Sequence, residues 1–199
     1  STTFGPAGIS VTLSSESGAS IFYTTDGTEP TATTPGTPYS GAIPITVTTT
    51  LKAIAKDGLN NFGPVMTEVY TLDTTGPTVT ADPTSTAFGP LGLDVELNSD
   101  DDDLASIFYT TDGTDPDTSA TRTEYTGAIH LTVTTTLKFI GYDNFDNKGA
   151  PGEETYTLDT TGPTVTADPT STAFGPLGLD VELNSDDDDL ASIFYTTDG

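Results

Sequence analysis

The sequence contains no cysteine and no tryptophan, a single histidine, and only 5 lysine and arginine residues against 30 aspartate and glutamate residues. Without cysteine, the chain has no disulfide, no thiolate metal site and no cysteine nucleophile. The formal net charge of −25 argues against nucleic acid and anionic membranes as partners, because both attract cationic patches, and it makes cations the natural partners. No apolar run approaches the ~18 residues of a spanning helix, so we expect no membrane insertion.

The most informative feature is an internal repeat. The 44 residues of Tyr70–Gly113 recur without a change as Tyr156–Gly199, 86 positions later. Self-similarity at a fixed spacing is typical of repeat architectures, and a unit this long is a whole domain. The predicted domains are residues 1–73, which lack their first strand, residues 74–159, which are complete, and residues 160–199, which are truncated. We expect the natural chain to continue in both directions.

Within the complete unit, short runs of alternating apolar residues are separated by Gly, Pro, Asp and Thr, a pattern typical of β-strands. The expected strands are residues 76–82, 91–98, 106–111, a short segment near Tyr125, and residues 128–133, 136–142 and 154–159. In the second of these, Leu93, Val95 and Leu97 are expected to point inward. Seven short strands in about 86 residues predict an all-β protein of tandem immunoglobulin-like or fibronectin-like β-sandwich domains.

The truncated unit repeats the sequence of residues 74–113. We therefore expect its first three strands to form in the same conformation. A few strands alone cannot bury enough apolar surface to offset the entropy of ordering. We expect their open edge, at residues 193–197, to be covered by another copy of the chain or by the continuation of the same chain.

Four segments carry a family resemblance. They are Ile-Phe-Tyr-Thr-Thr-Asp-Gly-Thr-Glu-Pro at 21–30, Tyr-Ser-Gly-Ala-Ile-Pro-Ile at 39–45, Thr-Thr-Leu-Lys-Ala-Ile-Ala-Lys-Asp at 49–57, and Tyr-Thr-Leu-Asp at 70–73. Together they resemble the immunoglobulin-like domain at the C terminus of chitobiase and β-hexosaminidases. The resemblance implies the fold over nearly the whole unit. It implies little about activity, because such modules are joined to many secreted and surface proteins of bacteria and archaea.

The joint between units carries a second resemblance. Leu-Asp-Thr-Thr-Gly-Pro at 72–77 is similar to the Asp-Thr-Thr-Ala-Pro linkers of bacterial immunoglobulin-like adhesin arrays, in which linker aspartates commonly help bind calcium. Glycine replaces the alanine here. The resemblance implies a calcium-binding role for Asp73 and for Asp159, its counterpart in the next joint.

Acidic residues gather in the loops that such a sandwich brings to the joint. Calcium takes six to eight oxygen ligands, and carboxylates clustered without a cation repel one another. The predicted calcium ligands are Asp73, Asp100, Asp101, Asp102, Asp103, Asp143 and Asp146, with Asp159 beginning the same site one unit later. Asp26 and Glu29 of the preceding unit are expected to face the same joint. The alternative is a solvated acidic surface, which is what most runs of charge are.

Other candidate sites are weaker. His130 is expected to point outward between the inward Ile129 and Leu131, so no Ser-His-Asp grouping can be assembled around it. Phe22 and Phe108 are candidates for stacking on sugar rings, but packing against a neighbouring segment is the favoured interpretation. The sequence therefore predicts no catalytic residue.

Together these patterns predict a non-enzymatic, extracellular structural repeat protein, whose units form a surface filament, stalk or layer with calcium-stiffened joints. Copies of the same chain, its own continuation and calcium are the expected partners. One alternative is an accessory spacer or carbohydrate-binding module of a secreted glycosidase. Another is the stalk of an adhesin, whose binding activity would lie in a separate tip domain.

Overall fold

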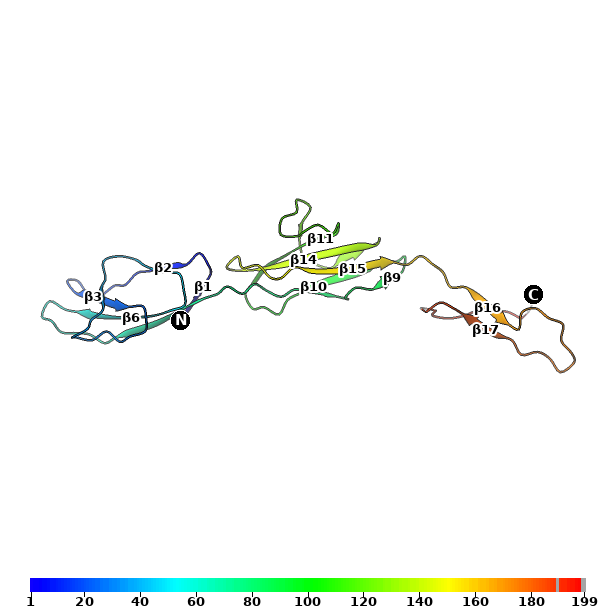
Figure 1. The fold of residues 1–199 in the computed structure, drawn as a ribbon, viewed down its shortest axis with the longest axis horizontal. Coiled ribbons are helices and arrows are strands. Elements are labelled where there is room, and N and C mark those ends of the chain that lie inside the picture. Colours follow the sequence, from blue (N-terminus) through cyan, green and yellow to red (C-terminus); the bar gives the residue numbers. More distant parts are fainter. Residues whose placement is uncertain (189, 198–199) are drawn as a thin grey trace.

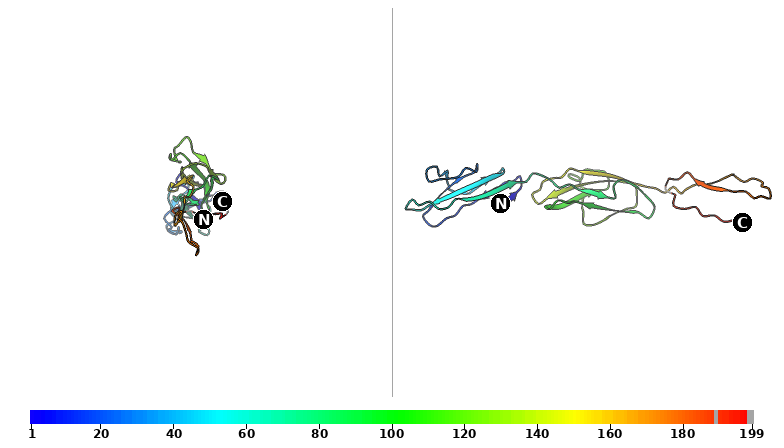
Figure 2. Two further views of the ribbon diagram at one scale, coloured as in Figure 1. Left: turned by 90° about the vertical axis from the view of Figure 1, so that its right-hand side faces the viewer. Right: turned by 90° about the horizontal axis from the view of Figure 1, so that it is seen from below.

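The computed structural model describes residues 1–188 and 190–197 of the chain. Three units follow one another along the long axis, joined by short extended linkers (Figure 1 and Figure 2). The described residues contain strands, turns and bends but no helix, which confirms the predicted all-β class. Accordingly, the search for a helix long and apolar enough to cross a membrane finds none among them.

The second unit is a sandwich of two sheets. Its strands are β8 (Thr80–Asp82), β9 (Ala87–Phe88), β10 (Leu93–Asn98), β11 (Leu104–Thr110), β12 (Thr123–Glu124), β13 (Ile129–Leu131), β14 (Thr135–Asp143) and β15 (Gly152–Leu158). One sheet has the order β12-β11-β14-β15-β9 and the other the order β13-β10-β8. Strand β9 was not predicted from the sequence. It pairs in parallel with β15 at the edge of the larger sheet.

The core of this unit lies between the two sheets. Strand β10 alternates between buried and exposed positions, as predicted, with Val95 0% and Leu97 3% exposed, while Leu93 is half-buried. Leu137 and Tyr156, from the opposite sheet, are also fully buried. The period of two in the sequence thus places one apolar face of each strand in the core, which is the main stabilising contribution to such a small domain.

The first unit repeats this topology without a counterpart of β8. Its strands are β1 (Thr2–Phe4), β2 (Ile9–Val11), β3 (Ser20–Thr24), β4 (Thr37–Pro38), β5 (Ile43–Ile45), β6 (Thr49–Lys56) and β7 (Met66–Leu72). The larger sheet, β1-β7-β6-β3-β4, matches that of the second unit strand for strand. The smaller sheet contains only β2 and β5.

The two units fill one part of the core with different residues. In the second unit, a Cβ added to Gly152 would lie 2.1 Å from the ring of Phe139, so the ring occupies the space above this glycine. In the first unit, alanine and methionine take the two positions, and Ala53 lies opposite Met66 across β6 and β7. The large side chain thus lies on β14 in the second unit, as Phe139, and on β7 in the first unit, as Met66. This exchange conserves the packed volume.

The third unit differs from the prediction. Strands β16 (Val165–Asp168) and β17 (Glu182–Ser185) form an antiparallel pair, but residues 190–197 form no strand. The expectation of a third strand there was wrong. In the second unit the corresponding strand, β11, pairs with β12 and β14, and residues 160–199 contain no counterpart of either.

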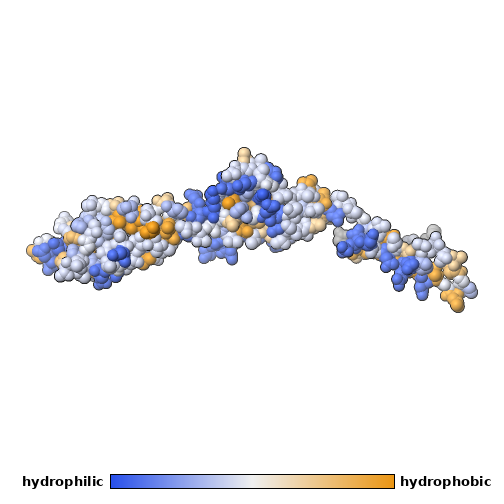
Figure 3. Space-filling view, viewed as in Figure 1, coloured by the Kyte–Doolittle hydropathy of each residue, from blue (hydrophilic) through white to orange (hydrophobic). Residues whose placement is uncertain are grey.

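Apolar side chains in the third unit are consequently exposed. Phe174 is 68% exposed, whereas Phe88, at the same position of the second unit, is 7% exposed. Val181 is 51% exposed, against 0% for Val95. Figure 3 shows this apolar surface toward the far end of the unit. The expected cover of residues 193–197, by another copy or by the continuation of the chain, stays a prediction.

A candidate cation site at the first joint

The joint between the first two units is built from backbone and side-chain contacts. The N–H of Asp73 donates to the carbonyl of Phe4 at 2.8 Å, which fixes the end of the first unit. The side-chain amide of Asn147, from the second unit, donates to the carbonyl of Asp73 at 3.3 Å. A Cβ added to Gly5 would lie 2.5 Å from the Cβ of Phe145. The loop between β14 and β15 therefore packs directly against the first unit.

Asp143 organises that loop. This residue is 2% exposed. Its Oδ1 accepts the N–H groups of Phe145 and Asn147 at 2.8 Å each, and its Oδ2 accepts the side-chain amide of Asn147 at 2.7 Å. Asp57 makes the corresponding bonds in the first unit, to Leu59 and Asn61. This carboxylate is thus part of the turn, as aspartates often are.

Three carboxylates meet beside this turn. Asp73 comes from the linker, Asp103 from the loop before β11, and Asp143 from the end of β14; one carboxylate oxygen of each lies within 4.8 Å of the others. Among the described residues, no ion pair involves any of the three. Asp103 also holds the neighbouring turn, because its carbonyl accepts the N–H of Asn144 at 2.9 Å.

The electrostatics of this carboxylate trio, as we call Asp73, Asp103 and Asp143, are unfavourable without a cation. Desolvation, followed by the charges of Asp143 and Asp73, raises the pKa of Asp103 above its ordinary value. A hydrogen bond between the side chains of Asp103 and Asp73 raises it further, because it needs the proton. Like charges at this separation favour either a shared proton or a bound cation.

The remaining predicted ligands of this joint lie outside the trio. Asp101 anchors the start of the second unit, because its Oδ2 accepts the N–H of Thr78 at 2.7 Å and the hydroxyl of Ser99 at 3.0 Å. Asp100, Asp102 and Asp146 are exposed. Asp146 adopts a left-handed backbone conformation, with φ of 64°. The sequence therefore indicated that acidic loops lie at the joint. It did not show which carboxylates come together in the trio and which anchor the backbone or face solvent.

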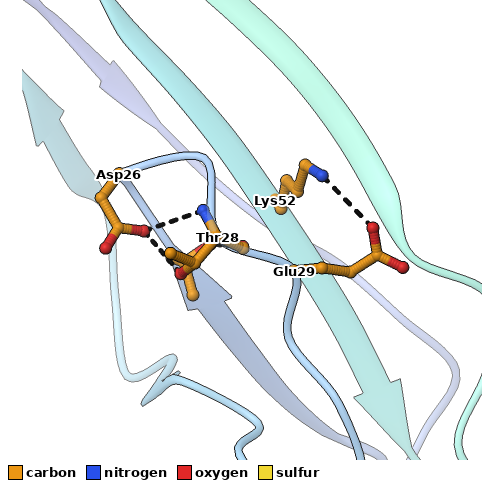
Figure 4. A network of polar contacts seen from close by, with 5 residues as sticks. Asp26, Thr28, Glu29 and Lys52 are labelled. Carbon is orange, nitrogen blue, oxygen red and sulfur yellow. Dashed lines mark hydrogen bonds and ion pairs between the residues drawn. The ribbon is translucent and has the colours of Figure 1, made fainter.

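Asp26 and Glu29, which we expected to face this joint, make contacts close to their own turn. As Figure 4 shows, Asp26 accepts the N–H and hydroxyl of Thr28, at 3.0 and 2.6 Å, and Glu29 forms an ion pair of 3.3 Å with Lys52. The hydrogen bonds with Thr28 lower the pKa of Asp26. Both acids belong to the turn after β3 and not to the carboxylate trio.

The second joint is only partly present. Asp159 accepts the N–H of Thr161 at 2.7 Å, as Asp73 accepts that of Thr75, and its own N–H donates to the carbonyl of Phe88. The counterpart of Asp103 is Asp189, which lies outside the described residues. Asp143 has no counterpart in residues 160–199. Asp159 therefore begins a similar arrangement without completing a trio.

The trio has the chemistry of a hard-cation site. Carboxylate oxygens are the ligands that Ca²⁺ prefers, and three carboxylates supply part of the six to eight oxygens it takes. Oδ2 of Asp143 accepts one hydrogen bond and so retains a lone pair for a cation. Backbone carbonyls and water would complete the coordination. The residues present therefore fit calcium.

The other candidate sites behave as structural or solvent-facing groups. His130 is exposed and bonds Asp94 across the strands at 2.7 Å. The ring of Phe108 packs edge-on against Tyr142, with centroids 5.8 Å apart, and the Arg122 guanidinium lies 4.4 Å from its centre. Phe108 therefore packs against Tyr142 and Arg122, in keeping with the favoured interpretation.

Comparison with known proteins supports the resemblance seen in the sequence. The model of the chitobiase/β-hexosaminidase C-terminal domain matches residues 3–67 and 83–153, more than half of the chain. The chain belongs to this family. Its members supply a non-catalytic, immunoglobulin-like domain of a glycosidase or a surface protein. The match falls once in the first unit and once in the second.

Solved structures and curated proteins add little. The fibronectin(III)-like modules of Clostridium thermocellum CbhA are similar to this chain at 16% sequence identity and a TM-score of 0.32, with 78% of this chain and 88% of that one covered. No curated protein matches the chain.

Proposed function

We propose that this protein is an extracellular, non-enzymatic spacer of a surface stalk, filament or layer, whose joints are stiffened by calcium. The observation that carries this proposal is the carboxylate trio, because Asp73 comes from the linker while Asp103 and Asp143 come from the second unit, from the loop before β11 and the end of β14. A cation bound there ties the end of one unit to the start of the next. Stiffness between units is what a spacer needs.

The affinity of the carboxylate trio for calcium should be modest, because its ligands come from separate segments of the chain. Extracellular modules typically bind calcium with Kd values on the order of 10⁻⁴ to 10⁻³ M. At about 100 times the Kd, binding stabilises the folded state by roughly 2.7 kcal/mol. That is comparable to the stabilisation by a disulfide in a small domain, which this chain lacks.

The experiment is to record small-angle X-ray scattering and thermal unfolding of the whole chain in calcium and in chelator. We expect a rod-like particle with a higher Tm in calcium, and a broader distribution of shapes in chelator. Asp103→Asn should abolish the difference. Asp146→Asn, which removes an exposed acid from the same joint, is the matched control and should retain it. Identical scattering and unfolding of the unmodified chain in both conditions would contradict the proposal.

The family match favours a second candidate, an accessory spacer of a secreted glycosidase. The packing of Phe108 beneath Arg122 supports a spacer over a carbohydrate-binding module. A binding assay with chitin and cellulose distinguishes the two: a spacer stays in solution and a carbohydrate-binding module is retained. An adhesin stalk is compatible with the same joints, and would likewise need a separate domain for its binding activity.

A further inference from the structure

The loop between β3 and β4 of the first unit carries a tip of exposed threonines. Residues 31–34, with the sequence Thr-Ala-Thr-Thr, are all exposed, and we call them the threonine tip. The backbone is fixed on both sides of it. Pro30 is fully buried, and a Cβ on Gly36 would meet the carbonyl oxygen of Tyr23. The fold therefore holds the two ends of the loop and leaves the tip in solvent.

The hydroxyl groups of the tip contact only one another. Oγ1 of Thr31 lies 3.2 Å from that of Thr33 and 2.8 Å from that of Thr34, and it accepts the N–H of Thr34 at 3.0 Å. Within the described part of the chain, no hydrogen bond ties these hydroxyls to a residue outside the tip. Thr31 thus holds the turn, while the hydroxyl of Thr33, with its single contact, is the most available.

The corresponding loop of the second unit uses its polar groups internally. Asp117 and Ser119 occupy the first and third positions of the corresponding tip. Asp117 accepts a hydrogen bond from the ammonium of Lys148 at 2.6 Å. The hydroxyl of Ser119 lies 2.7 Å from that of Thr121, which in turn donates to Asp112 at 2.8 Å. This loop is therefore bonded to its own unit, unlike the threonine tip.

The two loops also differ in charge. No charged residue lies between Glu29 and Lys52, whereas the corresponding stretch of the second unit contains three. The uncharged stretch contains four prolines among its threonines. Exposed surfaces normally depend on charged side chains to stay in solution. Segments rich in threonine and proline are typical of stalks that carry O-linked sugars instead.

We propose that the threonine tip is an O-glycosylation site, with Thr33 as the principal acceptor and Thr34 as the second. The proposal rests on the extracellular placement proposed above. The donor is a phosphate-activated sugar, and a separate transferase catalyses the step. Oγ1 of the threonine bonds to the anomeric carbon as the bond from that carbon to phosphate breaks. The hydroxyl proton passes to a base of the transferase, and the phosphate leaves with its carrier.

The hydrogen bonds explain why one loop is modified and the other is not. A sugar on Thr33 disturbs only the 3.2 Å contact with Thr31. A sugar on Ser119 would disturb its contacts with the hydroxyls of Thr114 and Thr121, at 2.8 and 2.7 Å. We therefore expect modification of the first unit and not of the second at this loop.

Peptide mapping of the protein isolated from the cells that produce it tests the proposal. Cleavage before aspartate releases residues 26–56, which contain the threonine tip, and residues 117–142, which contain its counterpart. We expect the first peptide to carry mass increments of whole sugar residues. Electron-transfer fragmentation should place them on Thr33 or Thr34, and alkaline β-elimination should remove them. The second peptide is the internal control and should have its unmodified mass.

A variant in the same cells provides the second test. Thr33→Val/Thr34→Val should abolish the increments on residues 26–56, and Thr118→Val, an exposed threonine of the other loop, should leave them unchanged. An unmodified first peptide, sugars only outside residues 31–34, or equal occupancy of both peptides would overturn the inference. An unmodified protein whose joints still respond to calcium overturns this inference alone. Recovery of the protein from the cell interior would overturn the extracellular spacer as well.

Discussion

The side chain of Phe145 in the second unit lies against the backbone of Gly5 in the first, so closely that a Cβ on the glycine would be 2.5 Å from the Cβ of the phenylalanine. The contact joins the turn after β1 to the loop between β14 and β15. It involves no carboxylate oxygen directly, although Asp143 of the trio accepts the N–H of Phe145 and so helps to hold the loop. The joint therefore has a steric component as well as an electrostatic one.

Gly5→Val should separate the two units without unfolding either. The added side chain has no space against Phe145, so we expect a wider distribution of inter-unit distances in pulsed electron spin resonance between labels on the two units. The Tm of each unit should change by less than the equivalent of about 0.5 kcal/mol. Gly89→Val is the matched control, because nothing lies within 4 Å of a Cβ at Gly89. An unchanged distance distribution for Gly5→Val would contradict the contact.

Asp103→Asn should have opposite effects with and without calcium. Because burial and the neighbouring Asp143 and Asp73 charges raise the pKa of Asp103, the stability linked to this group is present below its unfolded pKa of about 3.9 and is lost as pH rises through the folded pKa. In chelator at neutral pH, the variant should be more stable than the unmodified chain.

The two unfolding curves should converge as the pH falls toward 4. In saturating calcium at neutral pH the order should reverse, because the variant loses a ligand. Thermal unfolding over a pH series in chelator and in calcium measures both effects. A variant that is less stable under every condition would show that Asp103 is structural and not electrostatically strained.

Tyr156→Phe tests a buried hydrogen bond. The Tyr156 hydroxyl donates to the carbonyl of Pro83 at 2.6 Å from a fully buried ring. Its loss leaves the carbonyl unpaired and should cost about 1 to 2 kcal/mol in the free energy of unfolding, measured with urea. Tyr70→Phe, the equivalent change in the first unit, is the control, because residues 1–73 contain no counterpart of Pro83, and it should cost less. Equal costs would contradict this assignment.

Ionisation of Tyr156 should destabilise the second unit in alkali. Desolvation, together with the charges of Glu154 and Asp82, raises the pKa of Tyr156 to about 12. Its unfolded value is about 10, so this contribution is complete below pH 10 and is lost as the pH rises toward 12. Tyr156→Phe should remove this part of the pH dependence. Unfolding at several alkaline pH values provides the measurement.

The exchange of core residues between units predicts strong coupling. Gly152→Met alone places a side chain where the ring of Phe139 lies, and Phe139→Ala alone leaves a cavity that costs about 3 to 5 kcal/mol. The double variant reproduces the Ala53–Met66 pair of the first unit. We expect it to be more stable than either single variant in urea unfolding. Additive costs would show that the two units pack differently around this position.

The strands were predictable because their signal is local. Alternating apolar residues such as Val95 and Leu97 define a strand whatever lies next to it. Strand β9 was not predicted, because a strand of two residues is too short to show an alternating apolar pattern. Its partner, β15, is also distant in the sequence. The expected strand at residues 193–197 was wrong for a related reason. An identical sequence forms β11 only beside β14.

The role of each aspartate in the acidic loops could not be predicted from the sequence either. A run of aspartates predicts charge at the joint but not the role of each carboxylate. Asp101 bonds to backbone N–H of Thr78 and Asp143 to that of its own turn, while Asp103 faces like charges. These differences depend on loop geometry that four consecutive identical residues do not encode.

The Gly5–Phe145 contact also bears on how such a protein changes length. The first and second units each carry counterparts of both halves of this contact: a glycine after a short edge strand, Gly5 and Gly89, and a bulky apolar residue in the loop before the last strand, Leu59 and Phe145. Inserting or deleting one whole period of 86 residues therefore creates a matched pair at every new boundary. Gene duplication or unequal recombination within the repeated block can lengthen or shorten the array without requiring any compensating substitution.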